Sequence, residues 1–550
     1  MRRALLIAIA FFAAAAPGLA AQTAGGAAMR AGVESWSISG TVVSATTGAP
    51  LDRAEVTLGT TGTNGTDLAA TVTGDDGAFR FDGLAAGKYA LQASRRGYIT
   101  GSYEDHGGYF TAIVTGPGLD SQGLRFELMP YGVIDGTVMD DNGGPIAGAR
   151  VSLFRQDDFT GEGKIVGSGE ETTDDSGSYE FTDLRPDTYY LDVSATPWYA
   201  FRARTGSGNQ QGDDGQTQSP LDVAYPLTFY PNASDSGSAT PITINAGDHV
   251  QANFSLHAVP AIHIQLRVPI NGEARRGMET PMVAEDAFGS EQATGVAMPM
   301  LRRGDNSMTF DFGALAPGHY LIQQGAQSPT TLDAASSRTL DTPGLSGGVD
   351  ISGQFAMASG TPLPDRLWVW LRPIPDRRQP GGGRIGRDGM FTLHSVAPGT
   401  YEVMADGGQT GALVVAQMAA SGAEVRGSRI TVGSDPVLLA ATLAKGSTTI
   451  SGFAKCDGKG VGGTMIVLVP HDPDASTELF RRDQSDSDGS FTLRDVVPGS
   501  YTLVAIENGW TLEWAKREVM APYLIHGLKV EVGDNQKTMN LPEPVAVQER

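Results

Sequence analysis

The sequence predicts an all-β protein, a tandem array of about five small antiparallel β-sandwich domains. Three observations carry this prediction. Gly makes up 72 of the 550 residues while aromatic and β-branched residues stay plentiful, which favours short strands and tight turns over disorder. A motif of alternating apolar residues recurs along the chain, and a second shared motif precedes it. About seven short strands in roughly 90 to 125 residues is typical of a sandwich.

The first motif runs from a glycine to a tyrosine twelve residues later. Asp-Gly at its start favours a tight turn, because Gly accepts a positive φ. Alternating apolar residues then point to one core, and a Pro-Gly turn reverses the chain. The motif therefore predicts a β-hairpin with one buried face, anchored in the last copy by Tyr501. The four full copies and a fifth that lacks Asp-Gly are Gly77–Tyr89, Gly177–Tyr189, Gly389–Tyr401, Gly489–Tyr501 and Phe310–Tyr320.

The second motif, Ile-x-Gly, marks where domains begin. Together with the closing strands it predicts five sandwiches, the third of them degenerate, over residues 34–130, 131–258, 259–346, 347–446 and 447–545. Other predicted segments are a Gly/Ala-rich linker at 21–33, a polar insertion in the second domain at 204–219 and a long hairpin tip at 376–387. The stretch from Trp510 to Leu524 predicts one or two short helical turns. Short connections between the domains predict a semi-rigid rod.

The first twenty residues predict a signal peptide. Arg2 and Arg3 precede an apolar run from Ala4 to Ala16, and small residues then offer a cleavage site before Ala21. The apolar run is too short to span a bilayer, and an N-terminal membrane anchor is the alternative. We expect an exported protein that is periplasmic, outer-membrane-associated or extracellular, with no transmembrane segment in the mature chain.

Charge and cysteine content exclude some classes of partner and some sources of stability. The net charge of −22 disfavours nucleic acid, because no surplus of Lys and Arg is available to replace phosphate counterions. The same charge disfavours anionic lipid surfaces. Cys456 is the single cysteine, so no intrachain disulfide can form and packed cores must stabilise the fold.

Together the two motifs resemble the carboxypeptidase regulatory-like family. The string is Ile-x-Gly-x-Val, then Gly-x-Pro-[Leu/Ile]-x-x-Ala-x-Val, then Asp-x-Gly-x-Phe with its Pro-Gly-x-Tyr ending. The resemblance covers nearly all of residues 34–542 and implies a transthyretin-like (prealbumin- or immunoglobulin-like) sandwich, related to carbohydrate-binding-like folds. It implies tandem domains of the kind found in exported bacterial proteins. Because such domains accompany many activities, it leaves function open.

We find no motif for catalysis and predict a protein that is not an enzyme, with no catalytic residues, cofactor or metal. A zinc peptidase needs clustered His and Glu ligands, and no His-Glu-x-x-His occurs. A nucleophile elbow and a phosphate-binding loop are also missing. Acidic turns at Asp174–Asp175 and Asp483–Asp488 could hold calcium, although turn chemistry explains them better.

Exposed aromatic residues are the candidate ligand platform. Trp368 and Trp370 alternate on one strand, opposite the core positions Val369 and Leu371, so both point away from the core. They could stack on a sugar ring or pack under a neighbouring domain. Trp198 and Tyr199 form a weaker candidate of the same kind. The sequence therefore leaves two hypotheses for the function of the protein.

The favoured hypothesis is a non-catalytic secreted or envelope protein with a binding or structural role. The alternative is a carbohydrate-binding protein that uses exposed aromatic residues or loop ends. The partner expected is accordingly an envelope protein or a polysaccharide of unknown identity.

Overall fold

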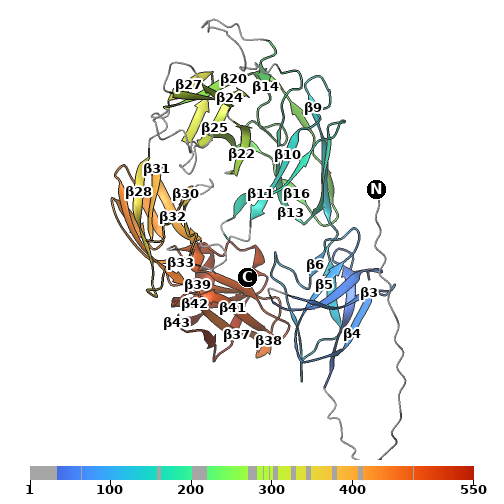
Figure 1. Ribbon diagram of the computed structural model, residues 1–550. Coiled ribbons are helices and arrows are strands. Elements are labelled where there is room, and N and C mark those ends of the chain that lie inside the picture. The colour runs from blue at the N-terminus through green and yellow to red at the C-terminus, as the bar shows by residue number, and fades with distance from the viewer. Residues whose placement is uncertain are drawn as a thin grey trace, which may run out of the picture.

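The computed structural model shows a chain built almost wholly of strands. It describes residues 34–62, 65–157, 161, 163–200, 220–269, 281–288, 290–296, 298–301, 307–323, 330–341, 348–374, 381–406, 413–474, 476–534 and 536–550. The predicted signal peptide, the linker and the polar insertion lie outside these residues. The strands form five successive units, which we call domains 1 to 5; each of the first four has two main sheets (Figure 1).

Domains 1 and 2 share one arrangement of strands. In domain 1 the sheets are β4-β1-β8 and β3-β2-β5-β6, with β7 also on β5; in domain 2 they are β12-β9-β17 and β11-β10-β13-β15, with β18 on β9 and β16 on β13. The strands of domain 1 are β1 (Trp36–Ser44), β2 (Glu55–Thr60), β3 (Asp67–Val72), β4 (Ala78–Leu84), β5 (Gly87–Ser94), β6 (Gly101–Ser102), β7 (Ile113–Thr115) and β8 (Leu124–Leu128). Those of domain 2 are β9 (Gly132–Asp140), β10 (Arg150–Asp157), β11 (Lys164–Thr172), β12 (Ser178–Leu184), β13 (Asp187–Ser194), β14 (Val223–Ala224), β15 (Thr228–Phe229), β16 (Ile242–Ile244), β17 (His249–Gln251) and β18 (Phe254–Leu256), with a 3-10 turn η1 (Ser236–Ser238).

Domains 3 and 4 also consist of two sheets each. In domain 3 these are β23-β24-β20-β27 and β22-β21-β25-β26, and in domain 4 they are β31-β28-β36-β33 and β30-β29-β32-β35-β34. The strands from the domain 2 junction to the end of domain 3 are β19 (Val259–Pro260), β20 (Ile262–Pro269), β21 (Met282–Ala287), β22 (Ser290–Val296), β23 (Met298–Leu301), β24 (Ser307–Leu315), β25 (Gly318–Gln323), β26 (Thr330–Ala334) and β27 (Arg338–Asp341). Those of domain 4 are β28 (Val349–Met357), β29 (Trp368–Ile374), β30 (Gly381–Arg384), β31 (Met390–Val396), β32 (Gly399–Asp406), β33 (Leu413–Ser421), β34 (Ala423–Arg426), β35 (Arg429–Val432) and β36 (Val437–Lys445).

Domain 5 differs in that its last strand, β45, pairs with both β37 and β42 and so joins the two halves of the sandwich. The predicted helical turns are present as η5 (Gly509–Thr511) and the single described α-helix, α1 (Arg517–Leu524). The other elements are β37 (Thr448–Cys456), β38 (Lys459–Gly460), β39 (Met465–Pro470), η4 (Thr477–Leu479), β40 (Arg481–Gln484), β41 (Ser490–Val496), β42 (Gly499–Ile506), β43 (Leu528–Val532), β44 (Thr538–Asn540) and β45 (Val545–Gln548).

The recurrent motif is not the hairpin that the sequence predicted. In domain 1 its first strand, β4, pairs with β1, whereas its second strand, β5, pairs with β2 in the opposite sheet. The same division separates β41 from β42 in domain 5. Both strands bury an alternating apolar face, so they can face each other across the core instead of lying side by side. The Pro-Gly segment therefore carries the chain from one sheet to the other.

Each domain also contains parallel pairing among its described strands, and domains 2 and 5 contain more than one such pair. The first strand pairs in parallel with the closing strand, as β1 does with β8 and β28 with β36. The predicted hairpin tip at 376–387 is in part a strand: Gly381–Arg384 form β30, which pairs antiparallel with β29. All other pairings in domain 1 are antiparallel, so the sandwich remains of the predicted type.

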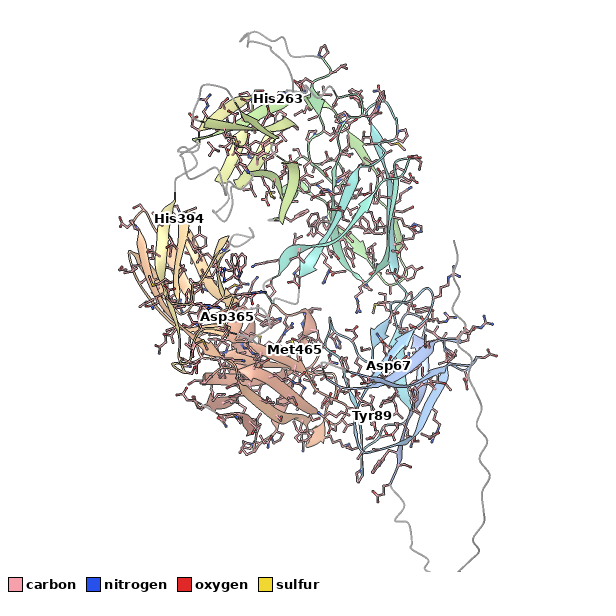
Figure 2. The ribbon with its side chains drawn as sticks, viewed as in Figure 1. Asp67, Tyr89, His263, Asp365, His394 and Met465 are labelled. Carbon is pink, nitrogen blue, oxygen red and sulfur yellow. The ribbon has the colours of Figure 1, made fainter. Side chains whose placement is uncertain are left out.

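The five domains do not form the predicted rod. They follow one another around a ring, and domain 5 returns to lie beside domain 1 (Figure 1). Figure 2 labels Tyr89 in domain 1 and Met465 in domain 5, which belong to these two neighbouring units. The rod was inferred from linker length alone, which does not determine how successive domains turn relative to one another.

Candidate functional site

The two tryptophans of β29 lie on the face of domain 4 that points away from its core. Val369 and Leu371 are buried in the core, so the alternation of the strand directs Trp368 and Trp370 to the other side. Trp368 is 40% exposed and Trp370 is half-buried. Their rings are nearly parallel, with centroids 5.8 Å apart and an interplanar angle of 18°. The pair presents an apolar surface on the sheet that faces the middle of the ring (Figure 1).

Cross-strand neighbours give this surface polar edges. Trp368 lies opposite Arg384 on β30 and opposite Asp406 on β32. Trp370 lies opposite Gly382, where an added Cβ would come within 2.3 Å of the indole, so only glycine leaves room for the ring. Residues directly opposite in an antiparallel pair share a face. We name the set Trp368, Trp370, Arg384 and Asp406 the tryptophan face; it can stack on a flat apolar ring and hydrogen-bond to groups at its rim.

The same face continues into the contact with domain 5. Arg372 pairs with the buried Glu402 and donates to Thr477 Oγ1 at 2.6 Å, and Thr477 N donates to Glu402 Oε1 at 3.0 Å. Burial alone would raise the pKa of Glu402, but the charge and hydrogen bonds of Arg372 outweigh it and hold the pKa below its ordinary value. One end of this strand is therefore packed between domains, while Trp368 at the other end remains accessible.

Trp198 and Tyr199 form a separate pair in domain 2. Trp198 is 90% exposed, and its ring meets that of Tyr199 edge-on at 5.6 Å and 87°. The Tyr199 hydroxyl also hydrogen-bonds to Tyr225. Among the described ring contacts none joins this pair to the tryptophan face, so the four predicted residues are not brought together into one site.

A second cluster, between domains 1 and 5, was not predicted from the sequence. His106 stacks on Trp510 with centroids 4.8 Å apart and an interplanar angle of 8°. The guanidinium of Arg482 lies 5.0 Å from the ring centroid of Tyr109 and 4.3 Å from that of Trp514. His106 Nδ1 also hydrogen-bonds to Gln484 Oε1 at 3.0 Å. We call this contact the closing interface; its two sides lie far apart in the sequence and share no local pattern.

The acidic turn that was considered for calcium belongs to the closing interface. Asp486 pairs with Lys88 and accepts from Ala112 N at 3.2 Å. Ser487 N donates to Ala112 O at 2.9 Å, and Ser487 Oγ accepts from Val114 N at 2.9 Å. Burial raises the pKa of Asp486, and the hydrogen bond and charge of Lys88 oppose that rise. The turn therefore uses its carboxylate to hold domain 1.

Domain 2 reaches the closing interface through the end of its β10–β11 hairpin. An added Cβ on Gly161 would lie 2.6 Å from the Trp514 ring, and Ala515 N donates to Gly161 O at 3.3 Å. Arg185 of domain 2 also pairs with Asp105 of domain 1 at 2.9 Å. Three domains thus meet around Trp514.

The described residues contain neither a candidate metal-binding cluster nor a helix that could span a membrane. No group of three or more His, Cys, Asp or Glu in the described part of the chain could hold a metal ion. His263 and His394, for example, lie in different domains (Figure 2). No helix in the described ranges is long and apolar enough to cross a bilayer. Cys456 is exposed and unpaired.

Comparison with known proteins supports the fold. The model of the carboxypeptidase regulatory-like domain matches residues 37–116 and 133–257. The model of the BOS complex subunit NOMO1-like second beta sandwich domain matches residues 449–522. Comparison with curated proteins finds no match.

Comparison with solved structures gives matches of low overall similarity. The Bacillus anthracis TIE protein is 8% identical with a TM-score of 0.18, over 74% of each chain. A streptococcal ancillary pilin is 8% identical with a TM-score of 0.18, over 56% of this chain and 99% of its own. The shaft pilin SpaA from Lactobacillus rhamnosus GG is 10% identical with a TM-score of 0.18, over 41% and 98%. At these TM-scores the likeness carries no argument about function. The family models instead confirm the resemblance predicted from the sequence: this is an all-β chain of sandwich domains with two segments of the carboxypeptidase regulatory-like type.

Proposed function

We propose that the protein is an exported, non-catalytic binding and structural protein of the cell envelope. The closing interface carries this proposal, because it fixes five sandwiches into one closed unit that can present its faces in a defined arrangement. The leader of Arg2, Arg3 and the apolar run from Ala4 supports export. The types of domain matched are regulatory and structural, which supports a role without catalysis.

The second candidate function is carbohydrate binding at the tryptophan face. Trp368 and Trp370 offer nearly parallel rings, and Arg384 and Asp406 flank Trp368 in the same cross-strand row. Aromatic rings can stack on the apolar face of a sugar, while charged side chains at the rim hydrogen-bond to its hydroxyl or carboxylate groups. Trp368 would be the principal contact, since it is the more exposed of the two rings.

A glycan-array screen of residues 21–550 separates the two candidates. Carbohydrate binding predicts a specific hit whose affinity falls at least tenfold in the Trp368→Ala/Trp370→Ala variant, because the stacking surface is removed. Trp198→Ala is the comparison variant: it deletes a more exposed tryptophan in another domain and should leave the hit unchanged, whereas loss of the hit in this variant would assign it to the pair of Trp198 and Tyr199. A negative screen on folded protein would reject carbohydrate binding and favour a protein partner of the closed unit.

A further inference from the structure

At two junctions between successive domains, a buried carboxyl group on one side meets a half-buried one on the other. At the junction of domains 2 and 3, the charge of Glu285 on β21 acts on Asp192 of β13. At the junction of domains 4 and 5, Glu402 of β32 lies beside Glu478 of η4. Asp192 and Glu402 are both 0% exposed. Two junctions therefore share one unusual feature, an interacting pair of acids of which one is fully buried.

Domain 3 packs an aromatic side chain, Phe288, on the face of domain 2 to which Asp192 belongs. Leu191 and Val193 point into the core of domain 2, so Asp192 points outward, toward domain 3. Phe288 follows β21 and inserts into a cluster on this outer face. Its ring centroid lies 5.0, 5.1 and 5.3 Å from those of Phe154, Tyr190 and Phe229. Asp192 is thus buried by the docking of domain 3.

The surroundings of Asp192 do not supply the partners that an ionised carboxylate needs. Ser152 offers a hydroxyl, but no backbone N–H in the described residues donates to either carboxylate oxygen. The charged groups that face Asp192 are Arg150 on β10, Glu170 on β11 and Glu285 on β21. Arg150 Nε also lies 3.9 Å from Glu170 Oε2, so the positive charge of Arg150 is shared between Glu170 and Asp192. Negative charge outnumbers positive charge here.

Glu285 approaches the same junction from the other side and is half-buried. Its carboxyl group interacts with the Tyr320 hydroxyl, whose own proton goes to Ala316 O, and accepts a hydrogen bond from Leu227 N; no cation is among the groups that shift its pKa. Burial raises the pKa of Glu285 to about 7, against those two interactions. Burial likewise raises the pKa of Asp192 to about 7, with a further contribution from the charge of Glu285. Two acids that repel each other across one contact, with one of them fully buried, cannot both ionise without a cost in free energy.

The junction of domains 4 and 5 repeats the arrangement with one acid ionised. Glu402 takes the hydrogen bonds of Arg372 and Thr477, and the charge of Arg429 also favours its ionised form. Glu478 has a buried oxygen, Oε2, with no hydrogen-bond partner in the described residues. Glu478 faces Glu402 and the cation Arg372 across the junction.

The remaining charges near Glu478 do not neutralise it. Asp406 adds a negative charge, and Arg481 already donates to the carbonyls of Glu478, Phe480 and Asp495. Burial, with the charge of Glu402, raises the pKa of Glu478 to about 8. The stable form of Glu478 at neutral pH is therefore the protonated one.

We propose that each of these two junctions takes up a proton when its domains dock, so that acid tightens the closed ring and alkali loosens it. An undocked carboxyl returns to water and to an ordinary pKa of about 4. Between that value and the docked value the docked form holds more protons, so the docking constant falls as pH rises, up to tenfold per pH unit for each proton. The fall ends near pH 7 for domains 2 and 3 and near pH 8 for domains 4 and 5.

Hydrogen exchange of residues 21–550 from pH 5.5 to 8.5, corrected for the intrinsic rates, tests the proposal. Protection of residues 225–233 and 284–288 should fall up to tenfold or more per pH unit toward pH 7. In the Asp192→Asn/Glu285→Gln variant both acids are permanently neutral, so protection should stay at its low-pH level throughout. Glu180→Gln removes an exposed carboxylate on the other sheet of domain 2, which is not among the groups that shift the pKa of Asp192, and should behave like the parent protein.

Three outcomes would overturn the proposal. The first is protection in the parent protein that does not change with pH, and the second is an unchanged pH dependence in the double variant. The third is recovery of protection at pH 8.5 on adding calcium chloride, which would mean that the acid pair holds a cation and not a proton. If the double variant is unstable, Glu478→Gln gives the same comparison at residues 476–484.

Discussion

At the scale of single residues, an equivalent tyrosine makes the same hydrogen bond in each of the five domains. The tyrosine that ends each motif is buried, and its hydroxyl donates to the carbonyl oxygen four residues earlier. The bonds run from Tyr89 to Ala85 (3.0 Å), Tyr189 to Arg185 (2.8 Å), Tyr320 to Ala316, Tyr401 to Ala397 (2.7 Å) and Tyr501 to Val497 (2.8 Å). The hydroxyl thus satisfies a carbonyl in the segment that crosses between sheets. Even the degenerate third domain keeps it.

Removal of this tyrosine should therefore destabilise one domain. Tyr501→Ala should lower the free energy of unfolding of domain 5 by roughly 3–5 kcal/mol, as large buried truncations do. Tyr501→Phe should cost about 1–2 kcal/mol, because the Val497 carbonyl loses its donor. Hydrogen exchange under increasing urea, measured on peptides of β41 and β42, gives both values. Tyr89→Phe should weaken domain 1 and leave these peptides unchanged; a loss below about 1 kcal/mol for Tyr501→Ala would contradict the assigned role.

The sequence predicted the burial of these tyrosines but not their bonds. Alternation with apolar residues places Tyr501 in the core, and its side chain is in fact only 3% exposed. The acceptor Val497 could not be predicted, because the segment was expected to be a hairpin turn. Likewise, Trp368 was placed on the outer face by register alone, whereas its neighbours Arg384 and Asp406 come from strands whose pairing the sequence does not reveal.

At the scale of elements, the glycine of Ile-x-Gly has a definite steric reason. An added Cβ would lie 2.2 Å from Leu124 O at Gly40, 1.8 Å from Ala252 O at Gly136 and 2.0 Å from Leu439 O at Gly353. In each case the obstacle is the chain at or beside the closing strand, which passes close to the first strand of the domain. The motif therefore marks where the end of a domain meets its beginning. The sequence located the motif, but long-range pairing explains it.

Gly353→Ala should separate β28 from β36 and destabilise domain 4 by roughly 1–3 kcal/mol, the usual cost of overpacking. The expected result is faster hydrogen exchange in both strands. Gly433→Ala is a matched control in the same domain, since no atom lies within 4 Å of its added Cβ. Equal protection in the two variants would show that the close approach of β36 is not what requires glycine.

At the scale of the whole molecule, the ring depends on contacts between residues far apart in the chain, which no local sequence pattern predicts. Lys88 and Asp486 are separated by 398 positions, and each is unremarkable within its own domain. The family resemblance describes single domains, and short linkers suggested a rod. The boundaries of the domains at single-residue precision also stay a prediction. The closed ring could not be predicted from the sequence, because it depends on the angles between domains at four successive junctions.

Loss of the closing interface should open the ring. The variant Lys88→Asp/His106→Ala/Tyr109→Ala removes the domain 1 side of the contact and puts a carboxylate opposite Asp486. Small-angle X-ray scattering should then show a larger radius of gyration and maximum dimension than for the parent protein. Arg80→Asp changes the charge of domain 1 at an exposed ion pair elsewhere and should leave the scattering unchanged. An unchanged curve for the triple variant would mean that other contacts fix the ring.

The closing interface joins two surfaces of one chain, so its strength does not depend on how much protein is present. Two surfaces linked by a chain meet at an effective concentration that is on the order of millimolar even for flexible links. The domains between them are folded and already turn the chain back on itself, so little loop entropy remains to be lost. A contact too weak to hold two separate molecules together in dilute solution can thus hold this ring shut.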